Sequence, residues 1–274
     1  AAVALAAAAA PAEMNADVHA RIAAHADALA RLRFVLRVQT DGGEREIEGE
    51  TTCIVIDASG LLLCSNTELG GYVRAMGQML GGRSFTATPS SLEIFLGDAD
   101  EPLGGQLLTR DSDRDLAWVQ IERDADASPL AAIDLDAHVS DVRPGSAFFV
   151  LRPLDPFFGR APLVTREVIG AVTEKPRRLL VPATPLRAGF GAPVFDAAGK
   201  LIGLTVLQMP ESGLGGGNPV SFISQGARMQ DMIGGVVLPA REAARATQLA
   251  REIWAEDEAL DPAAPADDEV SGTR

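Results

Sequence analysis

The chain has 274 residues, 47% of them apolar and 5% aromatic, which suffices for one large domain or two small ones with a mainly aliphatic core. Its formal net charge of −14 argues against a nucleic-acid or anionic-membrane binder, because such proteins present a basic face. Two cysteines and three histidines exclude a disulfide-rich scaffold and a four-cysteine zinc site, and we expect neither a metal nor a cofactor.

The two ends of the chain differ in composition from its middle. Residues 1–13 begin with AAVALAAAAA, a run shorter than the about 20 apolar residues of a transmembrane helix. This run is typical of a secretory leader or of an alanine-rich tail; we favour the leader, which predicts export to the periplasm or the medium. Apolar side chains at helical spacing predict helices over residues 14–32 and 233–260, and residues 261–274 predict a disordered acidic tail.

Between these ends, short runs of β-forming residues alternate with turn signals. Residues 33–40, for example, precede an Asp-Gly-Gly sequence that is typical of a hairpin. Roughly a dozen such runs are too many for one small barrel, so the sequence predicts an all-β core of two barrels.

The two cysteines flank one of these turns. Cys53 and Cys64 lie symmetrically about the turn signal at residues 57–60, so they face each other directly in a regular hairpin. Directly opposed Cβ atoms lie about 4.5–5.5 Å apart, close to the reach of a disulfide. An oxidising compartment favours a bridge, whereas a cytosolic one favours two buried thiols; we favour the bridge.

Four blocks of sequence stand out, at residues 54–63 (IVIDASGLLL), 111–117 (DSDRDLA), 142–172 and 189–203 (GFGAPVFDAAGKLIG). Their order and spacing resemble chymotrypsin-fold serine proteases of the HtrA/Deg type. They match, in order, the family's first hairpin, its catalytic-aspartate segment, the start of its second barrel and its nucleophile turn. The resemblance implies two orthogonal six-stranded antiparallel barrels, over residues 33–123 and 131–232, with the active cleft between them and a terminal helix at each end.

This resemblance leaves only one of the family's three catalytic side chains in place. The aspartate position falls on Asp115 and the serine position on Phe190. The histidine position falls near Thr67, and a shift of one residue either way gives Asn66 or Glu68. No histidine lies between His25 and His138, so the loss of the base does not depend on the alignment. A threonine hydroxyl does not titrate near neutral pH, and a benzyl group carries no nucleophile.

The turn that forms the oxyanion hole in the family is also altered. The family sequence G-N-S-G-G becomes A-G-F-G-A here, with Ala188, Gly189 and Gly191 as its remnant. Glycines at these positions let backbone N–H groups point at the oxyanion, so the alanine substitutions put the hole in question.

The sequence therefore predicts a catalytically inactive protease homologue that binds protein or peptide partners, for which strand addition in the cleft is one route. One alternative is a divergent serine endopeptidase with a relocated nucleophile; Cys64 and Glu68 are the nearest reactive side chains, but neither has a catalytic partner in the motif. The other is a structural component of the cell envelope, in which the terminal helices could mediate homo-oligomers.

Overall fold

The structure, a computed structural model, describes residues 13–40, 43–71, 86–97, 99, 101–124, 126–139, 141–186, 189–208 and 235–260. Within these residues, twelve strands form two closed six-stranded barrels, and the ladders between neighbouring strands are antiparallel. The predicted all-β core of two six-stranded antiparallel barrels is confirmed. Apart from Glu13, the leader-like segment at residues 1–13 lies outside the described residues, as does the predicted acidic tail at 261–274.

The strands follow the chain barrel by barrel. The first barrel consists of β1 (Leu29–Thr40), β2 (Gly43–Val55), β3 (Leu61–Ser65), β4 (Thr86–Leu96), β5 (Leu103–Asp111) and β6 (Leu116–Ile121). The second consists of β7 (Ala147–Pro153), β8 (Pro162–Thr173), β9 (Leu179–Pro182), β10 (Pro193–Phe195), β11 (Leu201–Leu207) and β12 (Gly235–Pro239). The helical elements are α1 (Glu13–Ala23), η1 (Ala26–Ala28), η2 (Thr67–Gly71), η3 (Pro156–Phe158) and α5 (Ala240–Leu260).

The N-terminal helix predicted at residues 14–32 is too long. The helix α1 ends at Ala23, and β1 begins at Leu29, so the first barrel starts four residues earlier than predicted. Side chains alternate along β1: Phe34 and its neighbours two residues away are buried, whereas Arg33 and Arg37 are exposed. This period of two suits a strand, and pairing with both β2 and β4 fixes it.

The C-terminal helix predicted at residues 233–260 is also wrong at its start. Residues 235–239 form β12, which pairs with β11 along its length and with β9 at Val237 and Leu180. This strand closes the second barrel, which therefore extends beyond residue 232. The β-branched pair Val236 and Val237 favours the strand, and the helix begins only after Pro239.

Three apolar clusters hold the molecule together. One fills the interior of the first barrel and one the interior of the second. The third lies between the barrels; it includes Leu63, Trp118, Phe149, Phe195, Val206 and the buried alanines of α5. The barrels therefore share a packed interface.

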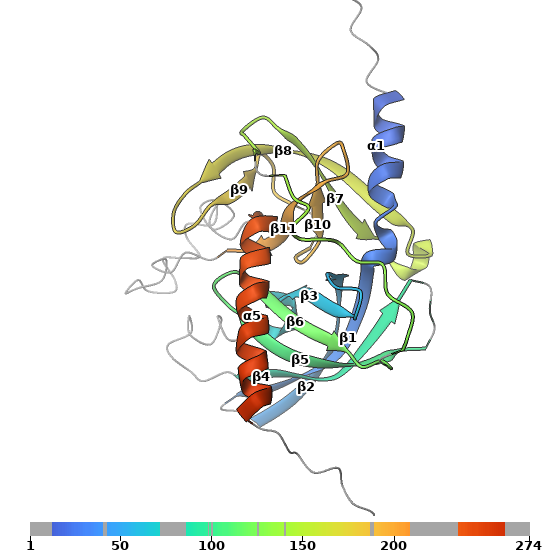
Figure 1. Cartoon of the computed structure of the whole chain (residues 1–274), viewed down its shortest axis with the longest axis vertical. Coiled ribbons are helices and arrows are strands. Elements are labelled where there is room, and N and C mark those ends of the chain that lie inside the picture. Colours follow the sequence, from blue (N-terminus) through green and yellow to red (C-terminus); the bar gives the residue numbers. More distant parts are fainter. Residues whose placement is uncertain are drawn as a thin grey trace, which may run out of the picture.

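Both terminal helices pack on this two-barrel body. The helix α5 runs across both barrels (Figure 1), and the indole Nε1–H of Trp118 in the first barrel donates to Thr247 Oγ1 of α5 at 3.0 Å. The helix α1 lies beside β8, and the His25 ring that follows it stacks on Phe195 with centroids 4.6 Å apart. Among the helices that the structure describes, none has both the length and the apolar character of a membrane span.

Candidate functional site between the barrels

Asp115 lies in the turn between β5 and β6, and its buried carboxylate connects the two barrels. Its Oδ1 accepts the Thr67 backbone N–H at 2.6 Å. Its Oδ2 accepts the Ser65 hydroxyl at 3.0 Å and, from the second barrel, the Leu207 backbone N–H at 2.8 Å. The backbone at Asp115 has a φ of +59°, a left-handed conformation that aspartate and asparagine adopt more readily than most residues. Both carboxylate oxygens are therefore engaged by groups of the protein itself.

Burial and these hydrogen-bond donors have opposite effects on the pKa of Asp115. Burial raises the pKa of Asp115, and hydrogen bonds from Leu207, Thr67 and Ser65 oppose the rise. The three donors are two backbone amides and a hydroxyl, with no imidazole among them. Asp115 is thus placed to tie the barrels together.

The histidines of the chain lie on other segments. His19 is an exposed residue of α1, and His25 has its Nε2 3.2 Å from the Gly199 carbonyl oxygen on the second barrel. His138 has its Nδ1 3.0 Å from the carbonyl oxygen of Leu135. The structure therefore offers no imidazole to stand between Asp115 and a nucleophile.

The turn η2 follows β3 and carries the predicted position Thr67. It is a single π-type turn, in which the Gly71 N–H donates to the Asn66 carbonyl oxygen at 2.7 Å. Gly70 within this turn has a φ of +93°. Thr67 contributes its backbone N–H to Asp115, while the next residue, Glu68, extends its side chain from the same turn.

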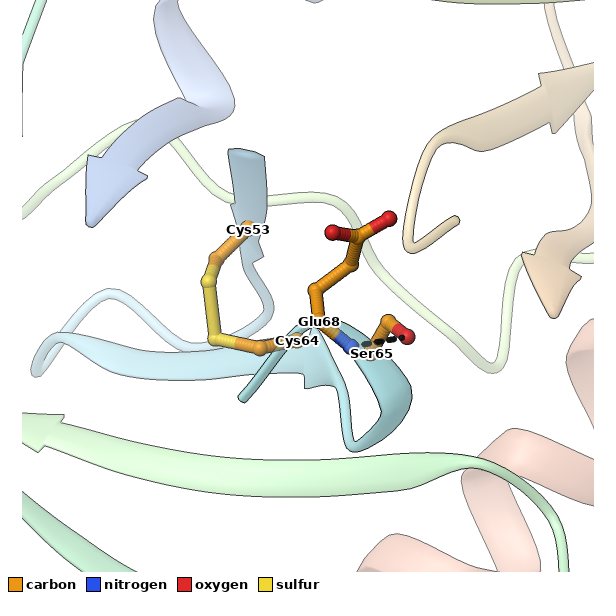
Figure 2. Close-up of a disulfide and its surroundings, with 4 residues drawn as sticks. All are labelled: Cys53, Cys64, Ser65 and Glu68. Atoms are coloured by element: carbon orange, nitrogen blue, oxygen red, sulfur yellow. Dashed lines mark hydrogen bonds between the residues drawn. A yellow bond between two sulfur atoms is a disulfide. The ribbon is translucent and has the colours of Figure 1, made fainter. Parts of the chain in front are cut away.

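Glu68 is a half-buried residue that reaches across to the second barrel. Its backbone N–H donates to Ser65 Oγ at 3.3 Å (Figure 2), and its carboxylate lies near enough to the Phe190 backbone N–H for that group to affect its pKa. Burial raises the pKa of Glu68, the Phe190 N–H opposes the rise, and the negative charge of Asp115 adds to it. The sequence predicted no contact for Glu68, and no local pattern indicates that its side chain lies near Phe190.

The turn at Gly189–Phe190–Gly191 lies against the first barrel. Gly189 and Gly191 have φ values of +75° and +83°, and a Cβ on Gly191 would lie 3.2 Å from both Ser65 N and Thr52 O. Thr205 of β11 secures this turn: its carbonyl oxygen accepts the Gly191 N–H at 2.7 Å, and its hydroxyl donates to the Gly189 carbonyl oxygen at 3.0 Å. Close approach of the barrels thus requires glycine at position 191.

The ring of Phe190 packs on its own barrel. A Cβ on Gly235 of β12 would lie 3.4 Å from Phe190 Cε1 and 3.4 Å from two atoms of Leu186. An apolar ring therefore lies beside Leu186 and β12. Of the predicted oxyanion-hole remnant, Gly189 and Gly191 are in this turn, and Ala188 lies outside the described residues.

The disulfide predicted from hairpin symmetry is present between Cys53 and Cys64 (Figure 2). Their Cα atoms are 4.4 Å apart, because the neighbouring pairs of β2 and β3 are directly opposed. Both half-cystines are buried, and Ser65 beside them is completely buried and donates to Asp115. Neither Cys64 nor Ser65 therefore presents a free nucleophile to a substrate.

Comparisons with known proteins agree with this architecture. The family model described as “Trypsin-like peptidase domain” matches residues 51–204. No protein with a curated description matches the chain. Among solved structures, the HtrA-type protease AlgW with a decapeptide is 19% identical, with a TM-score of 0.52 over 86% of this chain and 67% of that chain. A variant of AlgW with a tripeptide is 20% identical, with a TM-score of 0.50 over 85% of this chain and 62% of that chain.

These comparisons confirm the resemblance to chymotrypsin-fold proteases of the HtrA type at the level of the fold. The chain spans only 62% of the length of the AlgW variant.

Proposed function

The chain belongs to the trypsin-like peptidase domain family, and on that premise we propose that it is a non-catalytic member that binds a protein or peptide partner. The proposal rests on Phe190, which the resemblance to the family places at the nucleophile position and whose ring lies beside β12. Hydrolysis by this fold requires a hydroxyl or thiolate at that turn and a base beside it.

The surroundings of Asp115 support the same conclusion. In a working triad the aspartate orients a histidine, and loss of single triad members lowers the rate by several orders of magnitude. Here the Asp115 carboxylate oxygens accept hydrogen bonds from Thr67, Ser65 and Leu207. These bonds give Asp115 a structural role that needs no histidine. The alternative of a relocated nucleophile loses its nearest candidate nucleophile, because Cys64 is in a disulfide. Ser65 beside it is buried and donates its hydroxyl to Asp115.

Peptide binding needs backbone groups and apolar pockets, which survive the loss of a triad. The AlgW structures contain a tripeptide and a decapeptide, and we propose that this chain takes an extended peptide between its barrels by strand addition. The disulfide supports an oxidising compartment, so we propose export to the periplasm or the medium as the setting.

Fluorescein-labelled unfolded casein tests binding and cleavage in one sample. We expect its fluorescence anisotropy to rise and saturate as the protein is added, with no new fragments on a gel after prolonged incubation. Cleavage that is abolished by a serine-reactive fluorophosphonate would overturn the non-catalytic assignment. An anisotropy that does not change would overturn the proposed binding of unfolded peptides.

A further inference from the structure

The helix α5 lies on the surface of the two-barrel body (Figure 1) and carries two exposed aliphatic side chains. Leu249 and Ile253 are 55% and 52% exposed, and they lie one helical turn apart on one face of the helix. The packed face of α5 is made by other residues, among them the buried Ala243, Thr247 and Ala250. Docking of α5 on its own barrels therefore leaves an aliphatic pair in water that a further contact would stabilise by burial.

Charged side chains flank this pair in a definite order. Arg245 precedes Leu249 by one helical turn, and Glu256 follows Ile253 by three residues, so the four side chains form one stripe along the helix. The Arg245 side chain is 59% exposed, and Glu256 is also exposed. We call these four residues the α5 stripe. From its N-terminal to its C-terminal end the stripe is positive, apolar, apolar and negative.

The charges near the end of α5 are unfavourable for an isolated helix. The C-terminus of a helix carries a partial negative charge, which favours basic side chains and disfavours acidic ones. The last turn of α5 has acidic residues in its sequence and no basic one, and Glu256 directly precedes it. A second helix that runs in the opposite direction brings positive charge to this end and removes the conflict.

We propose that the α5 stripe is a contact between two copies of this chain, whose α5 helices pack antiparallel about a two-fold axis. The axis passes at the level of residue 251, so that Leu249 of one copy lies opposite Ile253 of the other. Arg245 and Glu256 lie at nearly equal distances from this level, on opposite sides of it. Arg245 of each copy therefore lies beside Glu256 of the other. The contact goes beyond the proposed peptide binding and does not depend on it.

The charges of the stripe select the antiparallel arrangement. Each contact in a two-fold dimer occurs twice, so the antiparallel register gives two contacts between opposite charges. A parallel register places Arg245 beside Arg245 and Glu256 beside Glu256, which gives two contacts between like charges. Antiparallel packing at a shallow angle also sets the two helix dipoles in opposite directions. The stripe thus matches a copy of itself in one orientation.

The size of the contact sets its strength. The 21 residues of α5 span about 32 Å at 1.5 Å per residue. One pair of such helices buries less than the about 1,200 Å² of a stable protein complex, so the contact belongs to the weak and reversible class. We therefore expect a monomer–dimer equilibrium at about 10–500 μM protein.

Sedimentation velocity of the purified protein over this concentration range measures the equilibrium. We expect Ile253→Asp to weaken dimerisation about tenfold or more, because it places a charge at the centre of the contact. The matched control is Ile47→Asp on β2, since Ile47 is also 52% exposed; this variant should dimerise like the wild type. Thermal unfolding verifies that both variants are folded.

Charge reversal tests the register without altering the aliphatic pair. Arg245→Glu and Glu256→Arg should each dimerise about threefold or more weakly than the wild type, because each variant paired with itself has two contacts between like charges. An equimolar mixture of the two variants should dimerise about as strongly as the wild type. In the mixed dimer both contacts again join opposite charges.

The outcomes decide the proposal at each step. A dimer that Ile253→Asp dissociates and that the mixture of charge variants restores supports it. A wild type that stays monomeric throughout the range overturns it, as does a dimer that Ile253→Asp leaves intact or that Ile47→Asp weakens equally. A mixture that dimerises no more strongly than either charge variant alone overturns the antiparallel register, and the proposal with it.

Discussion

Replacing Asp115 by asparagine removes one acceptor oxygen from a buried point where three donors converge. Asparagine keeps the volume and tolerates the φ of +59°, so the backbone conformation is not at issue. If its remaining oxygen accepts the Thr67 N–H, its NH₂ group faces the Leu207 N–H and leaves that donor buried and unpaired. A buried unsatisfied donor costs about 1–3 kcal/mol, so we expect a loss of about 2 kcal/mol in the free energy of unfolding.

The loss is measured by urea unfolding and by the melting temperature. For a chain of this size, about 2 kcal/mol corresponds to a fall in Tm of about 4–8 °C. The matched control is Asp113→Asn in the same turn. The Asp113 side chain is exposed, and its hydrogen bond to the second barrel is made by the backbone carbonyl oxygen, which accepts from Gln208 and is unchanged by the substitution. Because the folded pKa of Asp115 lies above 3.8, this group stabilises the wild type more as the pH falls through that window, and the gap to Asp115→Asn should widen toward acid. A loss no larger than that of Asp113→Asn would refute the role of Asp115 as a tie between the barrels.

Three further predictions concern stability and are measured by urea unfolding. Gly191→Ala and Gly189→Ala place alanine at similar positive φ values, but only at position 191 does backbone lie 3.2 Å from the new Cβ. Gly191→Ala should therefore lower the free energy of unfolding by about 1 kcal/mol or more beyond the effect of Gly189→Ala. Equal effects of the two substitutions would contradict the close approach of the barrels at Gly191. Thr247→Val leaves the buried Trp118 Nε1–H without its acceptor and should cost about 1–3 kcal/mol, whereas an unchanged stability would mean that α5 is not anchored there. Replacing both half-cystines by alanine opens a loop with a sequence separation of 11 and should cost about 3 kcal/mol; a loss under about 1 kcal/mol would contradict this estimate.

The parts of the fold that the sequence predicted correctly depend on short-range patterns. The disulfide follows from the symmetry of one hairpin, whose register pairs Ile54 with Leu63. The end of the N-terminal helix was mispredicted because Leu29 and Leu32 fit helical spacing, whereas in β1 they lie on opposite faces, Leu29 in the cluster between the barrels and Leu32 inside the first barrel. Pairing of β1 with β2 and β4 decides between these patterns, and neither partner is visible in a local window.

In the candidate site, too, local patterns predicted which residues are present but not the contacts that they make. The identities of Thr67, Asp115 and Phe190 at the triad positions came from motif order alone. The hydrogen bond from Leu207 to Asp115 joins residues 92 apart in sequence, and the close approach of Gly191 to Ser65 joins different barrels. Such contacts depend on how two closed barrels pack, so the structure was needed to find them.

The central claim, that this protease fold has no working nucleophile, is tested most directly by a serine-reactive fluorophosphonate and the intact mass of the purified wild-type protein. Chymotrypsin in the same probe solution serves as the positive control. We predict that the mass of the protein stays unchanged while chymotrypsin gains one phosphonyl group. A stoichiometric gain of one phosphonyl group by the folded protein would contradict the account, provided that protein denatured by heat before the probe is added gains none. Such a result would show an activated hydroxyl.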